Sequence, residues 1–326
     1  MQMLLPIAAF FSVLLLLGIF LRTGFLASIK DIPNQRSLHT RPVPRFGGVA
    51  LMAGVVLGFA ALNGQTWPII LPVLLLTAVS FVDDIRGLSP IFRFLIHFLA
   101  AGVFAVGMFA SDSPLLLLAA IVIAVVWMLN LYNFMDGADG LAGGMTMIGF
   151  SVYGLQALVH AEPGLSTLSF CIAASAAAFL FYNFNPARVF MGDVGAVPLG
   201  FLAAALGLWG WHENLWQLWF PVLVFSPFVI DASVTLLKRL FRGEKVWEAH
   251  KEHYYQQLVQ LGWGHKKTAI AEYLLMGAAG LSALWMSSQS AIIQTSVLCI
   301  WLLVYLAIAL SIERALVSRE AQERSA

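Results

Sequence analysis

The chain is built from long apolar stretches separated by short polar segments. Each stretch approaches the roughly 20 residues that a helix needs to cross the hydrocarbon core of a bilayer. Eleven can be recognised, at residues 4–21, 47–63, 67–82, 93–110, 114–131, 144–160, 165–182, 194–211, 215–237, 268–288 and 291–311. The pattern predicts an all-α polytopic membrane protein with about 11 transmembrane helices.

The composition agrees with this prediction and indicates which kinds of binding partner the protein has. Of the 326 residues, 60% are hydrophobic and only 11% are charged, which excludes a soluble globular protein and indicates a lipid bilayer as the surroundings. The net charge of +1 gives no indication of nucleic-acid binding. No internal repeat and no long soluble segment interrupts the pattern, so residues 1–326 are interpreted as a single integral-membrane domain.

The basic residues indicate the orientation of the predicted helices. When the gaps between spans are assigned alternately to two sides, all eighteen Lys and Arg residues fall on one side, in 22–46, 83–93, 183–193, 238–267 and 312–326. The loops of the other side carry only the acidic residues Asp112, Glu162 and Glu213. The positive-inside rule makes the basic side cytoplasmic, with the N-terminus outside and the C-terminus inside.

One polar stretch between two spans carries four oxygen-bearing side chains at steps of three: Asn130, Asn133, Asp136 and Asp139. On a helix this spacing brings the side chains near one face. The glycines that follow, beginning with Gly137, let the backbone turn sharply or approach a ligand closely. A polar helix cap is the simpler interpretation, but one such side chain would serve as a cap. A divalent cation with a phosphorylated ligand fits all four.

A pair of adjacent carboxylates, Asp83 and Asp84, stands at the predicted cytoplasmic end of the third span. Two such groups repel each other and are disfavoured by the helix dipole, so they require a cation, a hydrogen-bond donor or a proton. The alternative is a solvated turn in which Arg86 and Arg93 partly compensate the charge.

A second acidic position, Asp193, lies between Gly192 and Gly195, where the eighth span is predicted to begin. The free amides and positive dipole of a helix start favour a carboxylate or phosphate oxygens there. A plain N-cap would also explain Asp193, but it gives no reason for the nearby Asn183 and Phe190. An aromatic ring beside a phosphate site can stack on a base.

Basic and imidazole side chains complete the candidates on the same side. Arg45 in the first loop and Arg188 before Asp193 are candidate phosphate-binding residues. His250 and His253 share a face if their loop is helical, and they suit sugar or phosphate contacts better than a zinc site. The alternative for this loop is an amphipathic helix on the bilayer surface. Asp231, inside the ninth span, is interpreted as structurally paired.

The predicted orientation places all of these segments on one membrane face. We therefore expect one cytoplasmic site that gathers carboxylates, amides, basic residues and imidazoles. Magnesium typically uses one or two carboxylates together with substrate phosphates. Such a site at the bilayer surface suits the joining of a soluble phosphate donor to a lipid phosphate.

At this point the sequence resembles the polyprenyl-phosphate N-acetylhexosamine-1-phosphate transferases of glycosyltransferase family 4. The resemblance rests on the Asp-Asp pair at 83–84, Asn-x-x-Asn-x-x-Asp-Gly-x-Asp-Gly-Leu at 130–141, Asn-Pro-Ala-x-x-Phe-Met-Gly-Asp at 185–193 and His-x-x-His-x-Tyr-Gln at 250–256. It implies a protein of the bacterial inner membrane that transfers a sugar phosphate from a UDP-N-acetylhexosamine to undecaprenyl phosphate and releases UMP. It also implies Mg²⁺, with Mn²⁺ as a substitute; a homodimer is left open.

The resemblance also implies roles for individual residues. Asp193 and Asn133 would hold Mg²⁺ with the pyrophosphate, and the backbone at Gly137 would join the uridine contacts of the side chains Asp139, Asn183 and Phe190. Asp83 or Asp84 would receive the lipid phosphate and is the suggested base. The catalytic candidates are thus Asp83, Asp84, Asp136 and Asp193. Because a phosphate monoester has its second pKa near about 6, we expect direct attack by the lipid phosphate without a strong base.

The last loop bears on the branch of the family. It lacks the His-His-His-Phe-Glu signature of the muramoyl-pentapeptide branch and is similar to the O-antigen-initiating branch, whose donors are UDP-GlcNAc, UDP-FucNAc and UDP-QuiNAc. Two alternatives stay open: a phospho-MurNAc-pentapeptide transferase, and a membrane transporter or cation channel. Transporters usually place ionisable groups near the bilayer midplane, whereas the acids here crowd one face.

Overall fold

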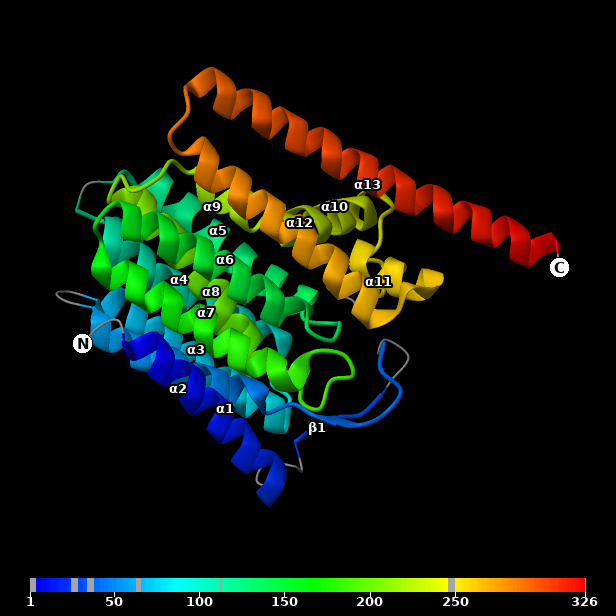
Figure 1. Cartoon of the computed structure of the whole chain (residues 1–326), viewed down its shortest axis with the longest axis horizontal. Helices are drawn as coiled ribbons and strands as arrows, with labels where there is room; N and C mark the ends of the chain where they lie inside the picture. Colours follow the sequence, from blue (N-terminus) through cyan, green and yellow to red (C-terminus); the bar gives the residue numbers. More distant parts are fainter. Residues whose placement is uncertain are drawn as a thin grey trace.

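The computed structural model describes residues 4–24, 29–33, 38–62, 66–111, 113–245 and 250–325; the predicted outer-loop residue Asp112 lies outside these ranges. Its long helices run side by side in one bundle, with α1 and α2 on one side and α12 and α13 on the other (Figure 1). Nine described helices are long and apolar enough to cross a membrane, and Gly47–Ala61 is a shorter apolar segment. The prediction of an all-α membrane protein is confirmed, while the orientation of the chain stays a prediction.

The elements follow the predicted spans closely. The long helices are α1 (Leu5–Thr23), α3 (Trp67–Arg86), α4 (Pro90–Phe109), α5 (Leu115–Met135), α6 (Leu141–Val159), α7 (Pro163–Asn183), α8 (Asp193–His212), α12 (Gly264–Met286) and α13 (Ala291–Ser325). The shorter ones are α2 (Gly47–Gly58), α9 (Trp219–Val224), α10 (Ser226–Phe241) and α11 (Tyr254–Leu258). Two short antiparallel strands, β1 (Lys30–Asp31) and β2 (Val43–Pro44), pair within the first loop.

The predicted span 215–237 is interrupted rather than continuous. Helix α9 ends at Val224 and α10 begins at Ser226, with Phe225 between them at φ −97° and ψ 10°. Pro227 follows in the first turn of α10, where its missing N–H costs no hydrogen bond. An apolar pattern does not report such a break, because hydrophobicity continues across it.

Glycines let α2 and α8 approach closely and thereby fix the loop before α8. A Cβ atom added to Gly48 would lie 2.4 Å from the backbone nitrogen of Gly195, so neither helix could carry a larger residue without moving. The amides of Gly47 and Gly48 donate to the carbonyl oxygens of Phe190 and Met191, at 2.9 and 2.8 Å. The start of α8 is therefore anchored to the start of α2, which places Asp193 at the end of the bundle.

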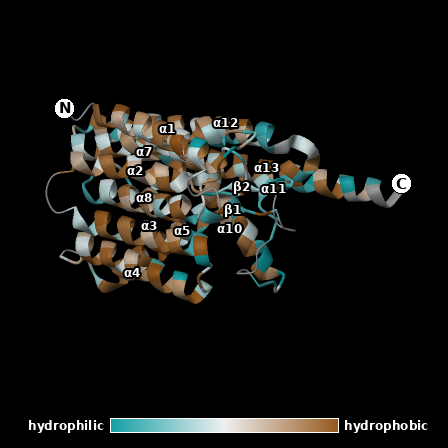
Figure 2. Cartoon of the chain, turned by 90° about the horizontal axis from the view of Figure 1, so that it is seen from below, coloured by the Kyte–Doolittle hydropathy of each residue, from teal (hydrophilic) through white to brown (hydrophobic). Residues whose placement is uncertain are grey.

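Hydrophilic residues gather at one end of the bundle, where α11, β1 and β2 lie (Figure 2). The long sides of the helices are mainly hydrophobic in the same view. This end contains the loops after α3, α5, α7 and α10, the four segments in which the sequence placed the candidate chemistry.

Candidate active site

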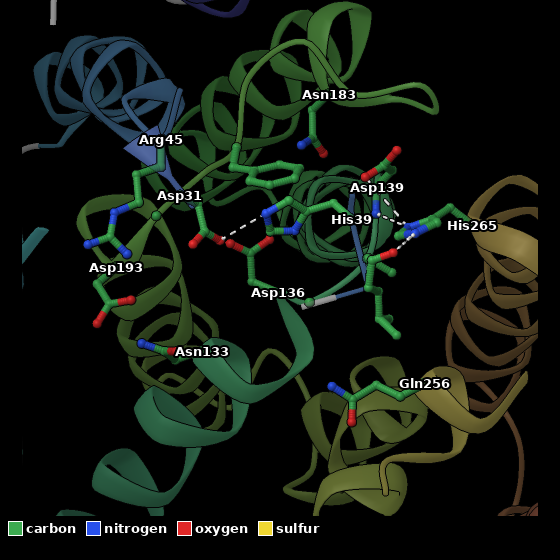
Figure 3. Close-up of a pocket in the computed structure, with 15 residues that line it drawn as sticks. Asp31, His39, Arg45, Asn133, Asp136, Asp139, Asn183, Asp193, Gln256 and His265 are labelled. Carbon is green, nitrogen blue, oxygen red and sulfur yellow. Dashed lines mark hydrogen bonds and ion pairs between the residues drawn. The ribbon is translucent and has the colours of Figure 1, made fainter. Parts of the chain in front are cut away.

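A hollow of about 420 Å³ opens at the hydrophilic end of the bundle (Figure 3). It collects most of the residues predicted as site residues, from loops far apart in the chain. The lining residues are Asp31, Leu38, His39, Arg45, Asn133, Asp136, Gly137, Ala138, Asp139, Asn183, Phe190, Gly192, Asp193, Gln256 and His265. We call this space the polar hollow.

The central Asn/Asp stretch reaches the polar hollow by a helix and a turn. Helix α5 ends at Met135, so the expected single helical face extends only through Asn133. Asp136 follows as the C-cap residue, with φ −85° and ψ 41°, and Asp139 lies in the next turn. Asn130 faces a neighbouring space and donates to the carbonyl of Val126 at 2.7 Å. The step of three is therefore not a helical stack, because the chain leaves the helix halfway through it.

The carboxylate of Asp84 is used by the first turn of α8. Its oxygens accept from the backbone amides of Asp193 and Val194, at 3.4 and 3.1 Å. The guanidinium of Arg45 lies 3.5 Å from the same carboxylate. Gly192 before the helix has φ +72°, and a Cβ there would lie 2.7 Å from Asp84 Oδ2. The amides expected to receive phosphate oxygens are thus already paired with Asp84.

The other member of the acidic pair, Asp83, faces Arg93. The Arg93 Nη1 atom lies 3.1 Å from Asp83 Oδ2 and 3.2 Å from Asp193 Oδ2, so one guanidinium bridges two carboxylates. The amide of Leu88 donates to the second Asp83 oxygen at 2.5 Å. Of the two arginines predicted to compensate the pair, Arg93 makes this contact, whereas the side chain of Arg86 is exposed.

A second, narrower hollow of about 160 Å³ lies between α3, α4, α5 and α8. Asn133 and Asp193 line both hollows, so the two spaces meet at these residues. Apolar side chains form most of the remaining wall. The lining residues are Leu76, Val79, Ser80, Asp83, Pro90, Arg93, Phe94, Ile96, His97, Asn130, Asn133, Phe134, Asp193 and Val197. We call this space the apolar hollow.

Asp136 lies among acidic neighbours in the wall of the polar hollow. Burial raises the pKa of its carboxyl well above the usual value, and the nearby carboxylates of Asp193, Asp84 and Asp31 raise it further. Such a carboxyl favours a proton or a cation. A positive charge beside Asp136 would stabilise the ionised form of its carboxyl.

Asp139 and Asn183 hold the opposite wall of the polar hollow together. Asp139 Oδ2 accepts from the side-chain amide of Asn185 and the backbone amide of Ala187, at 2.8 and 3.0 Å. Asn183 Oδ1 accepts from the amide of Gly140 at 3.0 Å, and its Nδ2 donates to the carbonyl of Val189 at 2.9 Å. Both side chains thus tie the central stretch to the loop between α7 and α8.

Several lining residues were not among the sequence candidates. The Nδ1 atom of His265 accepts from the backbone amide of Asp139 at 3.1 Å, which leaves its Nε2–H to donate to the carbonyl of Leu38 at 3.3 Å. The ring of His39 stands edge-on to that of Phe190, with centroids 4.9 Å apart. Asp31 and Gln256 complete the group. No spacing rule singles out these residues, because they enter from two segments far apart in the chain, Asp31 and His39 from the first loop and Gln256 and His265 from the segment after α10.

The histidine pair of the last loop lies outside the polar hollow. His253 is 3% exposed and is the N-cap residue of α11, and its ring stacks on that of Phe134. Since α11 begins only at Tyr254, His250 and His253 do not share a helix face, although their ring centroids are 4.8 Å apart. The expected sugar or phosphate contact of this pair has no support from the position of either ring.

Asp231 has the structural role that was expected of it. Its two carboxylate oxygens accept from the backbone amides of Tyr254 and Tyr255, at 2.9 and 3.0 Å. The buried acid therefore caps α11 from a neighbouring helix, and this fixes the position of the last loop.

Arg188 also lies apart from the other candidates. Its guanidinium stands over the ring of Tyr182, 4.8 Å from the centroid, and lines a different space beside α1. The predicted contact of Arg188 with the sugar or phosphate of the polar hollow therefore has no geometric support.

The side chains at which the two hollows meet include the oxygen ligands that a hard cation prefers. Among the described residues, no group of three or more His, Cys, Asp or Glu side chains is arranged to hold a metal ion without further ligands. Asp193 and Asn133 nevertheless lie next to each other, where the side-chain amide of Asn133 donates to the Asp193 carboxylate, with Arg45 on the other side of Asp193 (Figure 3). Magnesium commonly binds through one or two such ligands, with substrate phosphates and water supplying the others.

Comparisons with known proteins agree with the motifs. Residues 66–210 match the family model described as glycosyl transferase family 4, a segment that contains three of the four motifs. A probable undecaprenyl-phosphate N-acetylglucosaminyl 1-phosphate transferase of Bacillus subtilis is 28% identical over 316 residues, covering 91% of this chain and 88% of the relative.

Two further relatives carry related names. A decaprenyl-phosphate N-acetylglucosaminephosphotransferase of Mycobacterium leprae is 26% identical, covering 77% of this chain and 75% of the relative. A phospho-N-acetylmuramoyl-pentapeptide-transferase of Staphylococcus aureus is 26% identical, covering 81% of this chain and 91% of the relative. The comparisons support the family resemblance but do not separate its branches.

Proposed function

From the premise that residues 66–210 are a glycosyl transferase family 4 segment, we propose that this protein transfers N-acetylglucosamine 1-phosphate from UDP-GlcNAc to a polyprenyl phosphate. The names of the relatives from Bacillus subtilis and Mycobacterium leprae support both the sugar and the lipid. Undecaprenyl phosphate is the proposed acceptor, in a bacterial cytoplasmic membrane. Initiation of O-antigen or another surface polysaccharide is the proposed purpose.

The observation that carries this proposal is the meeting of two unlike hollows at Asn133 and Asp193. The polar hollow has the size and lining for a soluble nucleotide sugar, and the aromatic rings of Phe190 and His39 are the proposed stacking partners of the base. The apolar hollow lies between membrane-spanning helices and has a cationic residue at its polar end. A reaction between a soluble and a lipid-borne phosphate requires this arrangement.

Arg93 is the proposed contact for the phosphate of the lipid. Its guanidinium lines the apolar hollow and reaches Asp193, where the two spaces join. Arginine binds phosphate through paired N–H donors, so an arriving phosphate can replace one of its two carboxylate partners. Asp83 then holds Arg93 in place from the other side, at 3.1 Å.

The proposed chemistry is a direct displacement at the sugar-bearing phosphorus of the donor. An oxygen of the lipid phosphate forms a new bond to that phosphorus, the bond to the bridging oxygen breaks, and UMP leaves with this oxygen. No side chain needs to remove a proton, because the lipid phosphate is largely a dianion at neutral pH, its second pKa being about 6. Because the amides of α8 and Arg45 already engage Asp84, we assign it a positioning role rather than the role of a base.

Charge neutralisation and alignment are then the main contributions of the protein. A magnesium ion held by Asp193 and Asn133 would supply positive charge to the pyrophosphate and to the leaving UMP. Arg45 lines the same hollow beside Asp193 and adds a fixed cation. The pKa of the Asp136 carboxyl is raised, so a nearby positive charge would also stabilise the ionised form of this side chain.

The proposal is tested by measuring UMP release from the purified protein in detergent with Mg²⁺ and undecaprenyl phosphate. UDP-GlcNAc, UDP-FucNAc, UDP-QuiNAc and UDP-MurNAc-pentapeptide are compared as donors. We expect UMP from UDP-GlcNAc only when lipid and metal are both present, and a loss of about 100-fold or more in Asp193→Asn. Ion flux without UMP release in proteoliposomes would instead favour a transporter. Release from UDP-MurNAc-pentapeptide alone would assign the chain to the other transferase branch.

A further inference from the structure

Arg188 and Arg22 line a hollow on the outside of the bundle that no part of the proposed reaction uses. The hollow has a volume of about 730 Å³ and lies between α1 and the end of α7. Its lining residues are Phe11, Leu14, Leu15, Gly18, Ile19, Leu21, Arg22, Tyr182 and Arg188. Two cations therefore stand at one part of an otherwise apolar or aromatic surface.

Neither guanidinium has an acidic partner among the residues that the structure describes, and no acid lines the hollow. This distinguishes the pair from Arg45 and Arg93, which both contact carboxylates of the active site. Two unpaired guanidinium groups at the edge of an apolar surface attract an anion, and phosphate is the anion that arginine matches best.

Tyr182 orients Arg188 toward this hollow. The guanidinium lies over the tyrosine ring, 4.8 Å from its centroid, and the backbone amide of Arg188 donates to the carbonyl of Tyr182 at 2.8 Å. The tyrosine hydroxyl donates to the carbonyl of Leu14 in α1 at 3.3 Å. A Cβ on Gly18 would lie 3.3 Å from that hydroxyl, so the glycine allows the close contact. Arg188 is thus held beside α1 by packing.

The apolar part of the hollow follows α1 away from the two arginines. Phe11, Leu15 and Ile19 lie one turn apart on the same face, and all three are well exposed on the side of the bundle. From Phe11 to Arg22 the helix rises by about 16 Å at 1.5 Å per residue. This is about half of the ~30 Å hydrocarbon core, the depth of one leaflet. The surface therefore has the length of one acyl chain layer and a cationic end.

We propose that this hollow binds an anionic phospholipid of the cytoplasmic leaflet, with its phosphate between Arg22 and Arg188 and an acyl chain along Phe11, Leu15 and Ile19. Figure 1 places α1 at the edge of the bundle, where lipid has access to it. The cationic end lies at the end of α1 that the charge distribution assigns to the cytoplasm, where anionic lipids are concentrated. A zwitterionic lipid carries its own ammonium group and gains less from two unpaired arginines.

The lipid would also join two segments that are far apart in the chain. Arg188 belongs to the loop that connects α7 to Asp193 at the start of α8, while Arg22 lies in the last turn of α1. Binding at both arginines fastens this loop to α1 from outside the bundle. The site is separate from the proposed transfer reaction, and it can be tested without measuring activity.

The test is a lipid titration of the full-length, delipidated protein in detergent, followed by native mass spectrometry. Phosphatidylglycerol is compared with phosphatidylcholine in the wild type and in Arg22→Gln/Arg188→Gln. The matched control is Arg86→Gln, an exposed arginine in the last turn of α3 that does not line this hollow. We expect one phosphatidylglycerol to bind, at least about tenfold more tightly than phosphatidylcholine, and the double variant to lose about tenfold or more.

Several outcomes would overturn the proposal. If Arg86→Gln lost as much affinity for phosphatidylglycerol as the double variant, binding would depend only on the general positive charge at the membrane boundary. Equal binding of phosphatidylcholine would remove the anionic recognition, and displacement by millimolar inorganic phosphate would show that no acyl chain is bound. Tighter binding of a polyprenyl phosphate than of phosphatidylglycerol would make the hollow an acceptor site. If the double variant does not fold, the single variants Arg22→Gln and Arg188→Gln are compared with the wild type in the same way.

Discussion

Arg93 of α4 contacts the carboxylate of Asp193 at the start of α8 across 3.2 Å, and this ion pair marks the boundary between the polar and the apolar hollow. The same guanidinium contacts Asp83, so its charge is shared by two acids when no substrate is present. A phosphate that enters the apolar hollow meets this cation first. The proposed division of the site into a donor side and an acceptor side therefore depends on Arg93.

Replacing Arg93 with Gln tests this division. We expect the KM for polyprenyl phosphate to rise by about tenfold or more, because a charge-assisted hydrogen bond to the acceptor is lost, while the KM for the UDP-sugar changes much less. Steady-state UMP release at varied acceptor and varied donor measures both values. Arg86→Gln serves as the control and should match the wild type. A larger change in the donor KM than in the acceptor KM would place Arg93 on the wrong side of the site.

Asp84 is expected to act mainly through the position of α8. Asp84→Ala removes the acceptor of two backbone amides and the partner of Arg45, so we expect unfolding to become easier by about 1–3 kcal/mol, with a smaller loss in Asp84→Asn. Thermal unfolding in detergent measures the difference. Glu213→Gln, an exposed acid at the opposite end of the bundle, is the control. Full stability of Asp84→Ala together with loss of activity would indicate a direct chemical role instead.

His265 links the central stretch to the first loop, and its removal should affect the donor side alone. In His265→Ala the amide of Asp139 and the carbonyl of Leu38 lose their shared partner, so we expect a several-fold rise in the KM for the UDP-sugar and little change in the acceptor KM. His160→Ala alters an exposed histidine at the far end of α6 and should have no effect. An equal rise in both KM values would mean that His265 supports the whole site rather than one wall.

His250 should make the fold less stable in mild acid. Burial, together with the nearby His253 and Arg239, lowers the pKa of His250 to about 4, and its Nδ1 accepts from the backbone amide of Glu252. The unfolded chain takes up a proton below about 6.5, whereas the folded chain does not do so until about 4, so stability falls as pH drops through this window. Unfolding midpoints at pH 7.5 and 5.0 should therefore differ less in His250→Gln than in the wild type.

Most of the architecture could be predicted from the chain because hydrophobic length directly reports membrane-spanning helices. The break between α9 and α10 was missed because the apolar run continues on both sides of it, although Ser226 and Pro227 are residues at which a helix commonly begins. The true end of α5 at Met135 was hidden for a similar reason. A spacing of three fits a helix, and the sequence does not show that this helix ends before Asp136.

The candidate site was partly predictable for a different reason. Asn133, Asp136 and Asp193 are polar residues in an apolar chain, and such residues must find partners near the membrane boundary. His39 lies in a loop and His265 in the first turn of α12, beside a loop, and both were missed because polar residues are ordinary in such segments. Arg188 was wrongly expected at the site for the opposite reason. Its loop reaches the site, but its side chain lies over Tyr182 and beside α1. The direction in which a loop side chain points depends on tertiary packing, which the sequence pattern does not show.

Asn183 has both ends of its side-chain amide occupied, by Gly140 on one side and Val189 on the other. With Asp139 it builds the wall of the polar hollow before any nucleotide arrives. In the proposed reaction the nucleotide sugar would therefore meet a preorganised surface, and little of its binding energy would be needed to order these loops. Selection among nucleotide sugars should accordingly follow rigid shape complementarity rather than closure of a lid around the ligand.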